Sequence, residues 1–241
     1  MMKVIIALFV GILLGGLLAW QTKPTLPLPE PISPSLIENM LTAQRELSNL
    51  PFRDLVPQVT DGKQVLPLDN DSRGLTEAIK TATEATRLFL NDPNGPVPKQ
   101  RRPNEISRFA EDHLQETLNA IPHITCEIPL NATGKRSRSG YPDLMVTDTR
   151  TSRIAYVDPK VYGADSETSS LRTFYFQPKR KTNKILHDAH HFIVGFRHDG
   201  NTGAWQFGQW QLVDLYHFEI GLKVEFNSSN RDLYRDELLV K

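Results

Sequence analysis

Gly140–Val146 (GYPDLMV) and Ile154–Val161 (IAYVDPKV) are two apolar stretches that each carry an aspartate. Both have the length and apolar character of buried β-strands. Asp143 and Asp158 are 15 residues apart, with a short polar segment between them, which suits two neighbouring antiparallel strands. Side chains two positions apart on a strand point to the same face, so Asp158 and Lys160 should project together. The pattern predicts that two aspartates and a lysine converge at one end of a sheet.

A helix is expected upstream of these strands, from Asn104 to about residue 121. Apolar residues recur along it at helical spacing: Ile106, Phe109, Ala110, Leu114, Leu118 and Ile121. At about 100° per residue, Glu111 falls at the border of this apolar face, whereas Asp112 and Glu116 lie on the opposite side. Glu111 is therefore the helix carboxylate best placed to reach a site beside the core.

Carboxylates gathered at one end of a sheet repel each other unless a cation lies between them. Ligation by oxygen atoms alone suits Mg²⁺ or Mn²⁺ and does not suit zinc. A metal ion held there can activate a water and polarise a phosphodiester. Lys160 would then orient that water or stabilise charge developing on the phosphate. Glu111 would join directly or through a metal-bound water.

These segments resemble the PD-(D/E)xK nuclease superfamily, which has the restriction-endonuclease-like fold. Pro142-Asp143 matches the PD half of the superfamily motif, and Asp158-Pro159-Lys160 matches the DxK half. The run Arg108–Leu114 resembles the helix that carries a glutamate before the motif in resolvase-like members. The resemblance covers about residues 104–197.

The resemblance implies metal-dependent cleavage of nucleic-acid phosphodiesters, usually in DNA. It implies that Glu111, Asp143 and Asp158 are metal ligands and that Lys160 is the catalytic lysine. Pro159 departs from the usual pattern, because proline lacks the amide donor of a strand ladder and prefers edges or bulges. The departure concerns the strand geometry rather than the residue types.

The remaining segments predict an α/β fold with a mixed sheet flanked by helices. Strands are expected at Ile124–Pro129, Tyr141–Thr147, Arg153–Tyr162 and His191–Arg197, with further strand material from Trp205 to Phe226. Residues 169–189 have helical character, although Pro178 must break or kink such a helix. We therefore expect a nuclease-like domain over residues 99–241.

Three segments precede this domain. Residues 1–22 contain the uncharged run Val4–Trp20 and are expected to be a signal anchor, with a cleaved signal peptide as the alternative. An anchor places the body on the extracytoplasmic side by the positive-inside rule, whereas cleavage would secrete it. Residues 23–34 form a proline-rich linker, and residues 35–98 a helical accessory region with helices near 35–50 and 75–90.

The charge balance conceals a basic middle of the chain. Over the whole sequence 28 Lys and Arg oppose 28 Asp and Glu, but residues 97–190 carry 15 basic and 11 acidic side chains. Candidate nucleic-acid contacts lie there in two clusters: Lys135, Arg136 and Arg138, then Lys179, Arg180, Lys181 and Lys184. Solvated loops are the alternative interpretation of each cluster. The single cysteine, Cys126, excludes an intramolecular disulfide and any multi-cysteine zinc site.

The leading hypothesis is a membrane-tethered, Mg²⁺- or Mn²⁺-dependent nuclease that acts on nucleic acid, with DNA favoured over RNA. Two alternatives stay open: a catalytically inactive nuclease-fold module that binds nucleic acid or protein at the membrane, and a structural protein of the envelope. The leading hypothesis requires the carboxylates of Asp143 and Asp158 to lie within about 5–6 Å of each other, close enough to share one metal ion.

Overall fold

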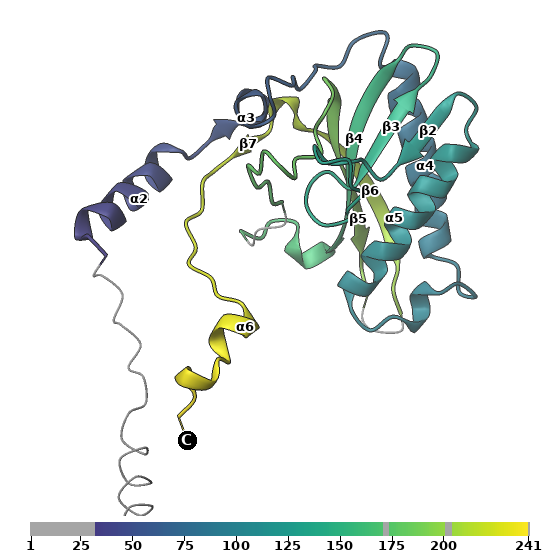
Figure 1. Cartoon of the computed structure of the whole chain (residues 1–241). Coiled ribbons are helices and arrows are strands. Elements are labelled where there is room, and N and C mark those ends of the chain that lie inside the picture. The colour runs from purple at the N-terminus through teal and green to yellow at the C-terminus, as the bar shows by residue number, and fades with distance from the viewer. Residues whose placement is uncertain (1–31, 171–173, 201–203, 241) are drawn as a thin grey trace, which may run out of the picture. The chain divides into compact units, whose positions relative to one another are not determined.

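The computed structural model describes residues 32–170, 174–200 and 204–240 (Figure 1). It divides the chain into two compact units, residues 47–223 and residues 1–46 together with 224–241. The described helices of the second unit are α2 (Pro34–Glu46), α6 (Asn230–Leu233) and the 3₁₀ turn η4 (Asp236–Leu238). The predicted signal anchor at residues 1–22 lies outside the described residues, as does most of the predicted linker.

Residues 47–223 are built on a five-stranded mixed sheet with the strand order β2-β3-β4-β5-β6 (Figure 1). The strands are β2 (Ile124–Glu127), β3 (Leu144–Asp148), β4 (Arg153–Gly163), β5 (His190–His198) and β6 (Phe207–Asp214). Neighbouring strands are antiparallel except β4 and β5, which are parallel. The predicted mixed α/β fold is confirmed.

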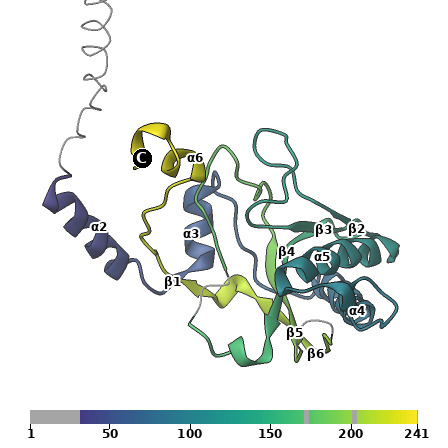
Figure 2. The same cartoon turned by 90° about the horizontal axis from the view of Figure 1, so that it is seen from below.

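Two long helices, α4 (Arg73–Leu90) and α5 (Pro103–Ala120), pack against one face of this sheet and lie side by side in both views (Figures 1 and 2). Their apolar stripes meet alternate strand residues in one buried core that includes Leu114 of α5, Val157 of β4 and Val194 of β5. The 3₁₀ turn η1 (Val97–Lys99) connects the two helices. Helix α5 is thereby held against the strands that carry the candidate site.

The opposite face of the sheet carries a second core. It gathers Phe52 and Val56 of α3 (Phe52–Val59), Tyr156 of β4 and Leu215 of the turn η3 (Leu215–His217). The short strands β1 (Leu50–Pro51) and β7 (Glu219–Ile220) pair beside it, and the turn η2 (Ala164–Ser166) follows β4. The central strands β4 and β5 are therefore buried on both faces.

Several local predictions differ from the structure. The helix expected over residues 169–189 is wrong for its described part, because residues 174–189 contain no helix. Phe174 and Phe176 instead make edge contacts with Phe52 at the border of the second core, so a backbone without helix partly buries them. Helix α3 was not predicted, because Pro57 lies inside it.

The predicted domain boundary at residue 98 falls inside the compact unit 47–223, because α4 shares a core with α5. Across the three described ranges of the chain, no helix is both long enough and apolar enough to cross a membrane.

Candidate functional site

Strand register brings the two aspartates of the motif to opposite positions. Leu144, the first residue of β3, pairs with Val157 of β4, so the antiparallel register sets Asp143 opposite Asp158 one step beyond. Asp158 is only 3% exposed, and the two carboxyl groups lie close enough to interact electrostatically. Burial, together with Asp158, raises the pKa of Asp143 well above its ordinary value. A proton or a cation is needed to hold these two groups together.

Lys160 forms an ion pair with one of these aspartates. Its Nζ atom lies 2.6 Å from Oδ2 of Asp158, and alternation along β4 places both side chains on the same side of the strand. The side chain of Lys160 is 34% exposed, whereas the side chain of Asp158 is 5% exposed. The ladder between β4 and β5 continues through Pro159, which pairs with Val194. An ammonium group thus extends from a buried aspartate toward solvent, where a substrate phosphate can approach.

Glu111 approaches from helix α5. Its Oε2 atom accepts a hydrogen bond of 3.3 Å from Nη1 of Arg138. Burial raises the pKa of Glu111, Arg138 opposes this shift, and Asp158 adds to it. The structure therefore places Glu111 within the electrostatic reach of Asp158, with Arg138 as its direct partner.

Arg138 was a candidate nucleic-acid contact, but its guanidinium is paired with carboxylates of the protein. Besides Glu111, it donates from Nη2 to Oδ1 of Asp112 at 2.7 Å. The guanidinium therefore ties the basic loop to two carboxylates of α5. Its positive charge is already paired in this arrangement.

Lys184 is the largest departure from the expected surface cluster. It is only 2% exposed, and its Nζ donates to the carbonyl oxygen of Ser137 at 3.1 Å. Burial lowers the pKa of Lys184, while Asp143, Asp158 and Glu111 oppose that shift. Lys184 is therefore a buried second lysine beside the carboxylates, although the sequence placed it among exposed basic residues.

The other basic candidates lie at the surface. Arg136 pairs with Glu127 at 2.7 Å and donates to the carbonyl of Ile128. The remaining four are exposed: Lys135, Lys179, Arg180 and Lys181. Nucleic-acid contact by these residues stays a prediction.

A buried histidine supports the segment that leads into Asp143. A hydrogen bond of 2.7 Å joins the Tyr141 hydroxyl to Nδ1 of His191 on β5. His191 is 0% exposed and is surrounded by the rings of Tyr141, Tyr156 and Phe52. Burial, with a smaller effect from His190, lowers the pKa of His191 to about 3. His191 is therefore neutral at pH 7 and holds Tyr141, two residues before Asp143.

Replacing His191 with glutamine is expected to weaken the acid sensitivity of folding. The unfolded chain protonates this histidine near its ordinary pKa of about 6.5, whereas the folded ring resists protonation down to about 3. As pH falls through this window, the free energy of unfolding drops by up to about 1.4 kcal/mol per pH unit through His191 alone.

Glutamine does not titrate, so His191→Gln loses this contribution, even if the variant is less stable at pH 7. Denaturant unfolding at pH 7, 5.5 and 4 measures the slope. The exposed His187→Gln variant is the control and should keep the wild-type slope. An unchanged slope for His191→Gln would contradict the burial argument.

The donor set at this site fits a hard divalent cation. Within the described residues, no three His, Cys, Asp or Glu side chains gather closely enough to hold one ion. Asp143 and Asp158 are the two carboxylates placed to share an ion, while Glu111 is paired with Arg138. Mg²⁺ typically binds one or two carboxylates and completes its shell with waters and substrate phosphates. The two aspartates therefore fit Mg²⁺ or Mn²⁺ better than zinc.

Comparison with known proteins supplies a family for this arrangement. The family model for the type II restriction enzyme MjaV family matches residues 46–237. The chain is 27% identical over 198 residues to the type II restriction enzyme MjaV of Methanocaldococcus jannaschii. The matched region covers 76% of this chain and 84% of that protein. No solved structure matches significantly. The matched region includes both halves of the motif and spans most of the sequence, so the chain belongs to the type II restriction enzyme MjaV family.

Proposed function

We propose that this protein is a DNA endonuclease of the restriction type that requires a divalent cation and cuts with Asp143, Asp158 and Lys160. The observation that carries the proposal is the placement of Asp143 opposite Asp158, with the Lys160 ammonium 2.6 Å from Asp158. Family membership supports DNA as the substrate. The identity of the metal and the roles of the individual residues are part of the proposal.

Each side chain has a separate task in phosphodiester hydrolysis, in which a water oxygen bonds to phosphorus and one ester P–O bond breaks. Asp143 and Asp158 would hold the divalent ion, which when bound would supply positive charge that polarises the phosphate and activates water. Lys160 donates hydrogen bonds to the phosphate oxygens as negative charge develops on them. Glu111, released from Arg138, would accept a hydrogen bond from the attacking water.

The test is cleavage of DNA by the full chain. Incubation with plasmid and genomic DNA in Mg²⁺ or Mn²⁺ should give discrete fragments, and excess EDTA should abolish cleavage because the aspartate pair then lacks its cation. Gel electrophoresis of the products measures both effects. Binding without cleavage of any DNA in either metal would instead support the inactive binding module, and cleavage that persists in EDTA would contradict the metal requirement.

We also propose that residues 1–22 tether the chain to a membrane, as a separate hypothesis that rests on the apolar run Val4–Trp20 alone. The family match begins at residue 46 and lends the tether no support. Fractionation of cells that express the full chain tests it. Recovery in the membrane fraction after a high-salt wash is expected, and recovery of the intact chain in the soluble fraction would contradict it.

A further inference from the structure

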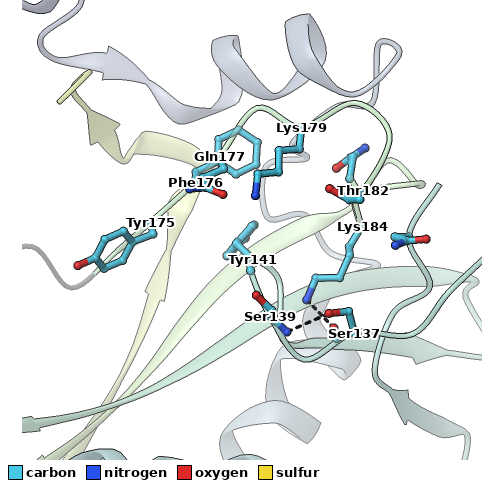
Figure 3. Close-up of a pocket in the computed structure, with 12 residues that line it drawn as sticks. Ser137, Ser139, Tyr141, Tyr175, Phe176, Gln177, Lys179, Thr182 and Lys184 are labelled. Atoms are coloured by element: carbon cyan, nitrogen blue, oxygen red, sulfur yellow. Dashed lines mark hydrogen bonds between the residues drawn. The ribbon is translucent and has the colours of Figure 1, made fainter. Parts of the chain in front are cut away.

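A cavity of about 300 Å³ is lined by Tyr141, two residues before Asp143, and by Lys184 (Figure 3). One wall is the loop that contains Ser137, Ser139 and Tyr141, which leads directly into Asp143. The other wall is the segment 175–184, which carries Lys179, Thr182 and Lys184. The cavity therefore lies between the motif loop and the irregular segment before β5.

The charged groups that line this cavity are two lysines, Lys179 and Lys184, beside uncharged polar and aromatic side chains. Asn131 and Asn183 also line it, but their side-chain oxygens already accept bonds from nearby backbone amides. The side chains of Thr182 and Lys179 make no hydrogen bond within the described residues, and both residues are exposed to solvent. No carboxylate is among the described residues that line the cavity. A cavity lined by two lysines and no carboxylate is suited to an anion.

Lys184 relates the cavity to the carboxylates of the motif. It interacts electrostatically with Asp143, Asp158 and Glu111 while lining the cavity. An ammonium group has three N–H donors, and the carbonyl of Ser137 accepts from one of them (Figure 3). A buried lysine is costly unless its charge is satisfied. The remaining donors of Lys184 are therefore available to an anion in the cavity.

We propose that this cavity is a phosphate subsite, in which Lys184 and Lys179 bind the phosphate that neighbours the scissile phosphate on the same DNA strand. The inference rests on the proposed function, because it takes the aspartate pair as the position of the cut phosphodiester. It assigns Lys184 to substrate binding and Lys160 to the reacting phosphate. The subsite fixes the position of the strand relative to the aspartate pair.

Two small ligands that a nuclease of this kind does not cut test the subsite. Thymidine 3′,5′-bisphosphate carries two phosphates one nucleotide apart, and thymidine 5′-monophosphate carries one. In Mg²⁺, calorimetric titration of the full-length protein should show at least about tenfold tighter binding of the bisphosphate, as expected for charge-assisted hydrogen bonds to a second phosphate. An absence of preference in the wild-type protein would overturn the proposal.

Variants assign the preference to the cavity. Lys184→Met should reduce the ratio of the two affinities to about two or less, whereas Lys80→Met, which removes the same charge from an ion pair on α4, should keep the wild-type ratio. A wild-type ratio in a folded Lys184→Met protein would overturn the proposal. If that variant instead weakens both ligands equally and also weakens Mg²⁺ binding, Lys184 is only a counterion of the aspartates, and the proposal is wrong.

Should Lys184→Met fail to fold, Lys179→Met tests the same cavity from its exposed side. It should lower the bisphosphate preference severalfold, and an unchanged ratio would overturn the subsite. Neither measurement depends on DNA cleavage. If the protein cuts DNA but shows no lysine-dependent preference for the bisphosphate, the proposed function holds and the subsite is wrong. If it shows the preference but cuts no DNA, the subsite holds and the proposed function is wrong.

Discussion

Lys160→Met is expected to lower the rate of DNA cleavage by roughly 10³-fold in kcat/KM while leaving DNA affinity within a few-fold of wild type. Methionine keeps an unbranched stem of similar length but removes the charge that lies 2.6 Å from Asp158. The Lys160 side chain is partly exposed, so the substitution leaves no cavity in the core. The loss should therefore fall on the chemical step, where the ammonium stabilises charge that develops on the phosphate.

Single-turnover cleavage and equilibrium binding of the same DNA separate the two effects. Lys80→Met on α4 is the matched control and should cleave at the wild-type rate. Wild-type cleavage by Lys160→Met would remove Lys160 from the mechanism. An equal loss in binding and cleavage would make Lys160 a contact for the ground state of the substrate rather than a catalytic residue.

The central geometry of the site was predictable from local sequence. Two apolar stretches separated by a short polar segment specify an antiparallel pair, and the two-residue period of a strand puts Asp158 and Lys160 on one side. Asp143 and Asp158 then face each other because the pairing of Leu144 with Val157 fixes the register. These relations follow from two consecutive strands and the short segment that joins them, so the local sequence pattern was sufficient to predict them.

The partners of the site depend on tertiary contacts that no local pattern encodes. Lys184 resembles its exposed neighbours in the sequence, yet it is buried because the segment before β5 folds against the motif loop, where the amide of Ala132 donates to the carbonyl of Asn183. Arg138 reaches Glu111 across 27 positions, and His191 reaches Tyr141 across 50. The basic cluster in the sequence therefore did not show which lysine lies at the surface and which lies beside the carboxylates.

The helix predicted over residues 169–189 failed for a related reason. The segment has helical character in sequence, but Phe174 and Phe176 pack around Phe52 without forming a helix. The contact with α3, far away in sequence, outweighs local helix preference. This irregular segment also forms one wall of the cavity that Tyr141 and Lys184 line.

Asp143→Asn is expected to stabilise the protein in EDTA. Burial and Asp158 raise the pKa of Asp143 in the folded state, whereas the unfolded chain releases this proton near pH 4. From about pH 4 upward the unfolded state therefore holds fewer protons, and this group lowers the free energy of unfolding until the folded pKa is passed. Asparagine carries no charge and avoids that cost. The gain at pH 8 should be at least about 1 kcal/mol, the equivalent of one pKa unit.

A divalent cation should reverse this advantage. Mg²⁺ stabilises only the folded state, by an amount that grows with its affinity, and wild type offers it two aspartates where Asp143→Asn offers one. Thermal melts in EDTA should therefore place Asp143→Asn a few degrees above wild type, on the scale of about 2–4 °C per kcal/mol. In saturating Mg²⁺ the difference should shrink or change sign, and the variant should no longer cleave DNA.

Asp112→Asn provides a control of opposite sign. Asp112 accepts hydrogen bonds from Arg108 and Arg138, which lower its pKa against the effect of burial, so its loss should destabilise the protein slightly in both conditions. If Asp143→Asn is less stable than wild type in EDTA at pH 8, the two motif aspartates do not repel each other in the folded state. In that case the argument that they await a cation fails. If it is more stable in EDTA and loses that lead in Mg²⁺, the repulsion that opposes folding is the same charge that binds the metal ion.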